Sequence, residues 1–415
     1  MPLPDDLLSP EATADPHAVL AALREHDPVH WSEAHRAWLL TRYDDVSAAF
    51  QNKALSNDRV RPLLAARRGH APSTSDQVLE LLASWMVVSD PPAHTRLRKL
   101  AGGAFKAQRI SAMDAQIERL VDDLLDTFVA GAPAGSDLIS DVAYPLPATV
   151  IATMLGAPVA DRDRFRDWSD ELALVAFGTG GEARADRHER ALRGLREMDA
   201  YFRDLIAVRR RDPGEDMLTA MMATDPDDPG DRLADDELVA MCALLLFAGH
   251  ETTTNSIANA TLALLRHPDQ LELLRDRPDL LAPAVEELLR FDGPIKVLNR
   301  WVVAETEIAG CVISPGQRVH LVLAAANRDP ARFDDPDRLD LTRSPNPHVA
   351  FGKGIHACIG AQLARMETRI AVGRIVARLP GMRLAGEPVW KDSLASRSLE
   401  ALPVAHDAGR KAAVG

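Results

Sequence analysis

Residues 351–365 (FGKGIHACIGAQLAR) combine a cysteine with a glycine-rich loop and the start of a helical pattern. Gly352 and Gly354 permit tight or left-handed backbone, and apolar side chains then recur at helical spacing over residues 361–379. Cys358 therefore lies just before a helix N-terminus, where free N–H groups and the positive end of the helix dipole favour a thiolate. A thiolate can bind a metal or act as a nucleophile.

Several uses of such a cysteine require partners that this sequence lacks. A zinc site needs three or four ligands, and Cys242 and Cys311 are far away in the sequence, within apolar runs. A phosphatase-type loop has five residues between its Cys and Arg, whereas Cys358 and Arg365 enclose six. A structural cysteine and a cysteine hydrolase stay open as alternatives, and a hydrolase would purify as a colourless protein.

The full pattern around the cysteine, Phe-x-x-Gly-x-x-x-Cys-x-Gly, resembles the haem-thiolate loop of the cytochrome P450 family. This resemblance implies that Cys358 binds the haem iron and that Phe351 packs near the sulfur. It also implies that Gly354 allows the turn, that Gly360 lets the helix approach the haem, and that His356 faces a haem propionate.

Two further segments fit the same family. His94 and Arg98 are four residues apart and so share one face of a helix, and the resemblance implies that both hold a haem propionate. Arg300 matches a family position that contacts the second propionate. Glu287 and Arg290 match the family's Glu-x-x-Arg, which implies a buried structural ion pair.

A long apolar segment, residues 236–266, predicts a buried helix that carries polar residues in its middle. Glu251 and Thr252 follow Ala248 and Gly249 there, which matches the family's Ala/Gly-Gly-x-Asp/Glu-Thr. The resemblance implies that Ala248 and Gly249 lie against the haem. It further implies that Glu251 and Thr252 supply protons to dioxygen, the co-substrate. A structural kink is the alternative, since Thr hydroxyls can bond back to backbone carbonyls.

The resemblance implies one domain over residues 1–415, mainly α with small β-sheets, in the cytochrome P450 fold. We expect the β-rich parts near residues 29–41, 297–322 and 382–404, and the helical core at residues 93–291 and 361–379. Haem b would be buried between the long central helix, residues 236–266, and the helix that follows the cysteine loop, residues 361–379.

Composition agrees with a cytoplasmic protein. The net charge of −13 gives no signature of nucleic-acid binding, and three scattered cysteines fit a reducing compartment. The first residues lack the features of a signal peptide, and no apolar run approaches the ~20 residues that cross a bilayer. We therefore expect a monomer without a membrane anchor.

One short segment carries a local positive charge, although the chain as a whole is negatively charged. Five basic residues and no acid lie between residues 96 and 109, in a sequence with 61 acidic residues. A solvated helix face would explain it, but Lys353 and Arg365 flank the proposed iron ligand. We expect a docking patch for an acidic iron–sulfur ferredoxin, itself reduced by an NAD(P)H-dependent ferredoxin reductase. The patch comprises Lys99, Lys106, Arg109, Lys353 and Arg365.

The reaction implied is a monooxygenase reaction on a hydrophobic small molecule, most simply hydroxylation of a polyketide, macrolide or terpenoid in secondary metabolism. Epoxidation or oxidative coupling stays open, as does a haem-thiolate sensor, although a sensor needs no Glu251–Thr252 pair. Residues 52–90 read as an irregular, partly basic loop that covers the substrate, or alternatively as a solvated loop. The candidate substrate-binding residues are Trp85, Met86, Val87, Phe247, Val297, Leu298 and Leu399.

Overall fold

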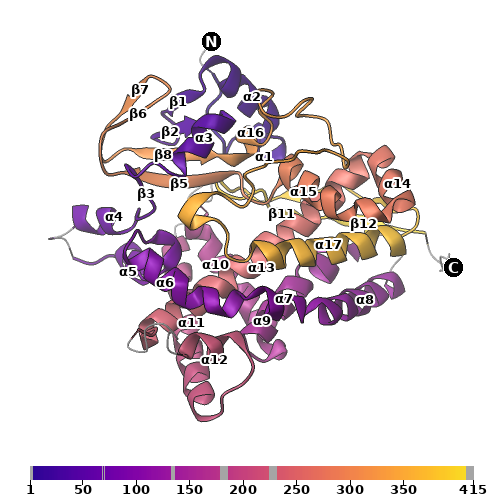
Figure 1. The fold of residues 1–415 in the computed structure, drawn as a ribbon, viewed down its shortest axis with the longest axis horizontal. Coiled ribbons are helices and arrows are strands. Elements are labelled where there is room, and N and C mark those ends of the chain that lie inside the picture. The colour runs from indigo at the N-terminus through magenta and orange to yellow at the C-terminus, as the bar shows by residue number, and fades with distance from the viewer. Residues whose placement is uncertain are drawn as a thin grey trace.

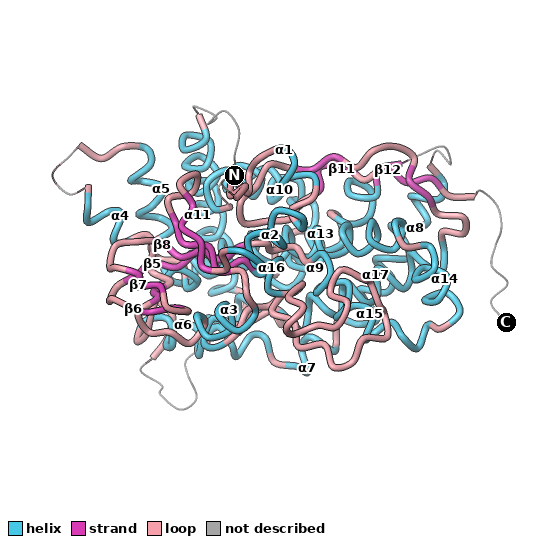
Figure 2. The backbone as a smooth tube through the Cα atoms, turned by 90° about the horizontal axis from the view of Figure 1, so that it is seen from above, coloured by secondary structure: helices cyan, strands magenta, loops and turns pink. Residues whose placement is uncertain are grey.

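The structure is a computed structural model that describes residues 3–67, 69, 71–131, 136–177, 186–223 and 231–407. Helices make up most of it, and a five-stranded sheet lies toward one end, at the top in Figure 1 and at the left in Figure 2. This is the mainly α architecture with small sheets that the sequence predicts.

The α-helices are, in chain order, α1 (Pro10–Ala14), α2 (His17–His26), α3 (Tyr43–Ala49), α4 (Arg61–Ala66), α5 (Thr74–Leu82), α6 (Ala93–Gly102), α7 (Ala107–Ser111), α8 (Asp114–Ala130), α9 (Pro145–Leu155), α10 (Arg162–Ala176), α11 (Arg187–Arg211), α12 (Met217–Met222), α13 (Asp235–Arg266), α14 (Pro268–Asp276), α15 (Leu281–Asp292), α16 (Leu323–Ala326) and α17 (Ala361–Arg378). Short 3-10 turns include η1 (Met86–Val88), η2 (Gly103–Phe105) and η6 (Gly354–His356).

In the described part of the chain, the strands form four small sheets. Their bounds are β1 (Val29–Ser32), β2 (Ala37–Leu40), β3 (Leu55–Ser56), β4 (Ser136–Asp137), β5 (Val297–Val302), β6 (Thr306–Ile308), β7 (Cys311–Ile313), β8 (Arg318–Val322), β9 (Arg383–Leu384), β10 (Val389–Trp390), β11 (Leu399–Ala401) and β12 (Pro403–Ala405). The largest sheet has the order β1-β2-β8-β5-β3 and is antiparallel except for the β2–β8 pair. Within it, β5 carries Arg300 opposite Val319.

The central helix α13 is buried along most of its length, as its apolar composition predicts. It begins where the Glu237 carboxylate accepts a hydrogen bond of 2.9 Å from the Ala234 N–H, and it ends at Arg266, two residues before Pro268. It packs against α9, α11, α15 and α17, so its middle lies in the core of the helical part (Figure 2).

The helix after the cysteine loop, α17, lies beside α8 (Figure 1). Arg369 pairs with Asp114 at 3.2 Å and Arg378 pairs with Asp122 at 3.1 Å. Half-exposed ion pairs of this kind contribute little individually, so the apolar contacts of α17 with α13 and α15 carry most of its stability.

The prediction that residues 52–90 are irregular is wrong. This segment contains β3, α4, α5 and η1. The Ser73 hydroxyl caps the start of α5 by accepting from the Asp76 N–H at 3.2 Å, and the Asp76 carboxylate bonds back to the Ser73 N–H. Val78 and Leu82 then bury one face of α5. Helices α4 and α5 are too short for a helical spacing of apolar residues to be recognised among the surrounding polar residues.

Glu367 in α17 is a buried acid that forms no ion pair with any residue that the structure describes. It is 1% exposed, and its Oε2 has no hydrogen-bond partner among the described residues. Burial raises its pKa well above the usual value for a glutamate. The folded protein therefore binds more protons than the unfolded chain at pH values between the two pKa values, and its stability falls there as the pH rises.

We expect Glu367→Gln to become progressively more stable than the parent protein as the pH rises from acidic to mildly alkaline. The gain arises because the amide needs no proton to stay neutral, and it grows by up to about 1.4 kcal/mol per pH unit within that window. Urea unfolding of both proteins across this pH range measures the difference. A difference that is constant with pH would contradict a protonated Glu367.

Candidate functional site

The cysteine loop is a compact turn that positions Cys358 at the start of α17. Gly352 and Gly354 have φ values of +67° and +71°, which side chains rarely adopt. A Cβ at Gly354 would lie 3.2 Å from the backbone oxygen of Phe50. The Cys358 N–H donates to the Phe351 oxygen at 2.9 Å, which closes the turn. Both glycines are therefore needed to bring the cysteine to this place.

The electrostatics of Cys358 differ from the expectation that the helix N-terminus alone favours a thiolate. Burial raises the pKa of the Cys358 thiol, and this outweighs the hydrogen bond from Gly360 and the positive charges of Arg98 and Arg365, which lower it. The residue is nonetheless exposed. A thiolate here needs an additional positive charge, such as a metal ion bound to the sulfur.

Four cationic or potentially cationic side chains, His94, Arg98, Arg300 and His356, form what we call the cationic cluster. The rings of His94 and His356 lie 3.8 Å apart, and the Arg98 guanidinium donates to the Ala357 oxygen at 2.7 Å. Both ring nitrogens of His94 and Nε2 of His356 are buried without a hydrogen-bond partner among the described residues. The structure therefore brings together the residues that the sequence assigns to the propionates.

The pKa values show that negative charge offsets the cationic cluster only in part, since Asp90 acts to raise the pKa of His94 and Arg300 but both stay lowered. Burial and the neighbouring cations lower the pKa of His356 to about 3, and burial lowers the pKa of Arg300 to about 10. The pKa of His94 is lowered by burial and by Arg98. Buried cationic groups are costly without an anion, so this cluster is suited to bind one.

The middle of α13 is accessible at one face although the helix around it is buried. Ala248 is exposed, and Gly249 and Thr252 are half-buried. The Thr252 hydroxyl donates to the Ala248 oxygen at 2.8 Å, which leaves its lone pairs available to accept a hydrogen bond. A Cβ at Gly249 would lie 3.2 Å from the Ile151 side chain, so the glycine makes room for α9. The structure thus explains the glycine at position 249 by its contact with α9, whereas the family resemblance explains it by contact with the haem.

Glu251 is held by residues that the sequence did not reveal. Its Oε1 accepts a hydrogen bond from the Asn255 amide at 3.3 Å, and Asn255 also donates to Ser398 at 2.9 Å. Lys391 lies 3.9 Å from the same oxygen and 3.2 Å from Asp170 of α10. Although burial opposes it, these two carboxylates raise the pKa of Lys391. Lys391, which follows β10, thus links the Glu251 carboxylate on α13 to Asp170 on α10.

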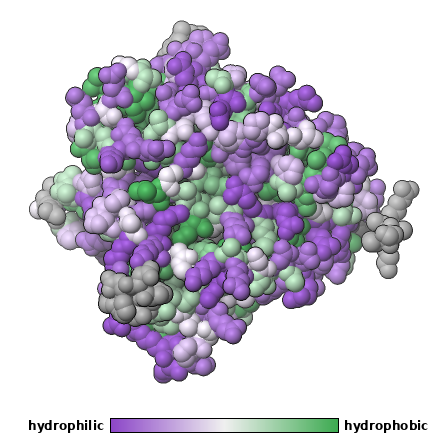
Figure 3. All heavy atoms as spheres, viewed as in Figure 1, coloured by the Kyte–Doolittle hydropathy of each residue, from purple (hydrophilic) through white to green (hydrophobic). Residues whose placement is uncertain are grey.

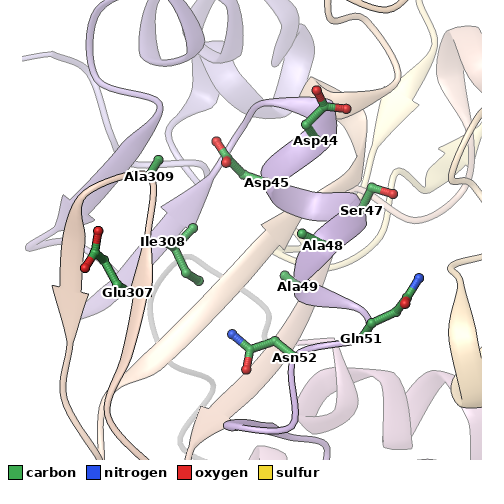
Figure 4. Close-up of a pocket in the computed structure, with 10 residues that line it drawn as sticks. All are labelled: Asp44, Asp45, Ser47, Ala48, Ala49, Gln51, Asn52, Glu307, Ile308 and Ala309. Carbon is green, nitrogen blue, oxygen red and sulfur yellow. The ribbon is translucent and has the colours of Figure 1, made fainter.

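One surface cleft lies away from these residues. It has a volume of about 590 Å³ and runs between α3 and the β6–β7 hairpin, with Asp44 and Asp45 on one side and Glu307 on the other (Figure 4). The residues that line it include none of the predicted site residues. It therefore belongs to the surface rather than to the site built around Cys358.

Comparison with known proteins decides the family. The family model for cytochrome P450 matches residues 29–380. The chain belongs to the cytochrome P450 family. It is 43% identical to "Cytochrome P450 107B1" of Saccharopolyspora erythraea, over 97% of this chain and 98% of that protein. It is 37% identical to "6-deoxyerythronolide B hydroxylase" of the same organism, over 97% and 98% respectively.

A solved structure shows the same fold. The bacillaene polyketide synthase cytochrome P450 PksS of Bacillus subtilis superposes with a TM-score of 0.86 at 33% identity, over 97% of this chain and 100% of that one. Membership of the cytochrome P450 family implies a haem iron and the use of dioxygen. Within the described part of the chain, no helix combines the length and the apolar character that a membrane crossing requires.

The residues present fit a haem. Among the described residues, Asp90 acts on the cationic cluster, but its two oxygens already accept hydrogen bonds from Ser56 and Asn57. The two carboxylates of a haem would supply the further negative charge. The Cys358 thiol is exposed, and a cysteine thiolate is one of the side-chain groups that can bind haem iron. The Ala248–Thr252 face of α13 is accessible in an otherwise buried helix.

The predicted substrate-binding residues lie in different environments. The rings of Trp85 and Phe247 are 6.0 Å apart, and Phe177 of the adjoining α10 end lies 5.1 Å from Phe247. Trp85, Met86, Phe247, Val297 and Leu399 are buried, Leu298 is half-buried, and Val87 is exposed. Val297 packs with the cluster of Leu7, Leu20 and Leu39, so it lies on the opposite face of β5 from its neighbours Leu298 and Arg300.

The predicted docking residues are not equally available. Lys99 and Lys106 are exposed. By contrast, Arg109 donates to the Asp216 oxygen at 2.9 Å, Arg365 pairs with Glu286 at 2.6 Å, and Lys353 donates to Tyr43 and Ser47 at 3.0 and 2.8 Å.

Apolar side chains gather near the centre of the molecular face in Figure 3, amid a largely hydrophilic surface.

Proposed function

We propose that this cytochrome P450 binds haem b and inserts one oxygen atom from dioxygen into a hydrophobic natural product of the polyketide or macrolide type, by hydroxylation. The observation that supports it most directly is the exposed thiol of Cys358 near a cationic cluster in which buried ring nitrogens of His94 and His356 have no hydrogen-bond partner among the described residues. The names of the relatives, among them a 6-deoxyerythronolide B hydroxylase and a polyketide synthase cytochrome P450, support the substrate class.

In this proposal the protein holds the haem from two sides. Cys358 binds the iron, Phe351 packs beside the ligand loop, and the cationic cluster binds the propionates. The Arg365 guanidinium lies 4.3 Å from the centre of the Phe351 ring, which fixes that ring next to the loop. A thiolate-bound haem supplies dioxygen activation and oxygen insertion.

The residues of α13 would handle the protons. Glu251 is the acid, and Asn255 and Lys391 orient its carboxylate. Thr252 accepts a hydrogen bond on the accessible face, since its own proton is donated to the Ala248 oxygen. The aromatic side chains of Trp85, Phe177 and Phe247 would exclude water from the substrate.

Substrate screening tests this function. The purified, haem-loaded protein is titrated with macrolide aglycones, linear polyketides and terpenoids, and the ferric absorption spectrum is recorded. Compounds that shift the spectrum are then incubated with a ferredoxin, its reductase, NADPH and isotopically labelled dioxygen. A product that carries one labelled oxygen atom supports the proposal. If no polyketide-type compound shifts the spectrum or is converted to product, the proposed substrate class is wrong.

We further propose that an acidic ferredoxin delivers the electrons near Lys106. Because Arg109 and Arg365 already make contacts within the protein, Lys106 is the member of the patch best suited to test it. We expect Lys106→Glu to slow reduction by the ferredoxin about threefold to tenfold at low ionic strength and to flatten its salt dependence.

Rapid-mixing kinetics at low and high salt measure this effect. Arg211→Glu is the matched control, since it reverses an exposed charge at the end of α11. Equal slowing by both variants would indicate a global charge effect, and unchanged kinetics in Lys106→Glu would contradict docking at this residue.

A further inference from the structure

Arg59 lies beside the cationic cluster, although its sequence context suggested a solvated loop. Its positive charge is one of the causes that lower the pKa of Arg300. Burial lowers the pKa of Arg59 itself, and the attraction that opposes this comes from Asp58. Within the described ranges, the Arg59 side chain makes no hydrogen bond or ion pair.

The backbone explains why Arg59 comes to this place. It follows β3, in which Ser56 pairs with Trp301 of β5, the residue next to Arg300. The Asn57 N–H donates to one oxygen of Asp90 at 3.0 Å, and the Ser56 hydroxyl donates to the other. Asp90 lies just before α6, which carries His94 and Arg98. The segment from Leu55 to Arg59 is thus fastened to two of the elements that bear the cluster, β5 and α6.

The charges near Arg59 do not balance within the protein. Asp90 is the acid that acts on both His94 and Arg300, and both of its oxygens already accept hydrogen bonds from Ser56 and Asn57. It is energetically unfavourable to bury a guanidinium away from water without pairing it with an anion. An anionic ligand of more than one charge would offset this cost, and a planar guanidinium suits a carboxylate.

We propose that Arg59 is a further haem-propionate ligand, which acts with Arg300 on the same carboxylate and fastens the segment after β3 to the haem. This inference rests on the proposed haem site. It extends that site to a segment between β3 and α4, which none of the sequence motifs marks. Arg59 would then contribute both to haem retention and to the positive potential around the iron.

Three variants test the proposal: Arg59→Gln, Arg59→Lys and the control Arg61→Gln. Arg61 is two residues away, is exposed, and pairs with Asp58 at 2.8 Å. Each ferric protein is mixed with an excess of a haem-scavenging apoglobin, and the haem transfer rate is recorded. We expect Arg59→Gln to lose haem about tenfold faster than the parent, Arg59→Lys to fall between them, and Arg61→Gln to match the parent.

The reduction potential of the haem is the second readout. Loss of a nearby positive charge favours the ferric state, so we expect a more negative potential in Arg59→Gln and not in Arg61→Gln. Equal haem loss and equal potentials in all proteins would overturn the role of Arg59, as would identical changes in Arg59→Gln and Arg61→Gln. These results would leave the haem assignment intact. A parent protein that binds no haem through sulfur would instead overturn the proposed function.

Discussion

Thr252→Ala is expected to lower the amount of product formed per pair of electrons by about 10- to 100-fold, while NADPH consumption continues. The Thr252 hydroxyl lies on the accessible face of α13 and is held by the Ala248 oxygen at 2.8 Å. Its removal takes away the group that receives and passes protons next to Glu251. The electrons should then leave as hydrogen peroxide, which is measured together with product and NADPH.

Thr253→Ala is the matched control for this prediction. Thr253 has the same side chain and the same kind of bond, to the Gly249 oxygen at 3.1 Å, but it is buried. Its replacement should leave coupling near the parent value. Both variants should keep their haem, because neither residue belongs to the cationic cluster or the cysteine loop. Tightly coupled turnover in Thr252→Ala would contradict a proton role for this hydroxyl.

Glu287→Ala is expected to cost about 3–5 kcal/mol of the free energy of unfolding, a large part of the stability of a typical domain. Glu287 and Arg290 are both 0% exposed in their side chains and are paired at 2.7 Å. Glu287 also binds Arg343 at 3.1 Å and accepts from the Asp340 N–H at 3.0 Å. Its loss leaves two guanidinium groups without their carboxylate.

Loss of Glu287 should also lower the haem content, because the segment that Glu287 binds, around Asp340 and Arg343, leads into the cysteine loop. Denaturant unfolding and the fraction of purified protein that carries haem measure the effect. Glu272→Ala is the control: Glu272 pairs with Arg275 at the same spacing of three residues, but its side chain is 63% exposed, so its loss should cost about 1 kcal/mol or less. Similar stability for both variants would contradict the importance of the buried pair.

Much of the site could be predicted because its signals are local in the sequence. The cysteine loop is one continuous segment, and Gly352 and Gly354 have positive φ values, as the glycine-rich sequence suggests. His94 and Arg98 are one helical turn apart, and both lie on α6. The buried pair of Glu287 and Arg290 is another local motif, three residues apart on α15. Such motifs need no knowledge of the distant chain.

What could not be predicted depends on contacts between distant segments. Lys391 reaches Glu251 only because the segment after β10 folds back over α13. Arg59 reaches the cationic cluster because β3 pairs with β5 and because Asp90 binds the residues before it. The raised pKa of the Cys358 thiol is likewise a product of burial, which outweighs the local effect of the helix N-terminus. A single sequence carries no local sign of these pairings.

The central claim is that the sulfur of Cys358 binds a haem iron. The most direct test is the absorption spectrum of the intact, haem-loaded protein after reduction under carbon monoxide. A thiolate ligand predicts the strongly red-displaced Soret band that is peculiar to sulfur ligation, and Cys358→Ser should lose it. A parent protein that carries haem and stays folded, yet shows no such band, would contradict the account.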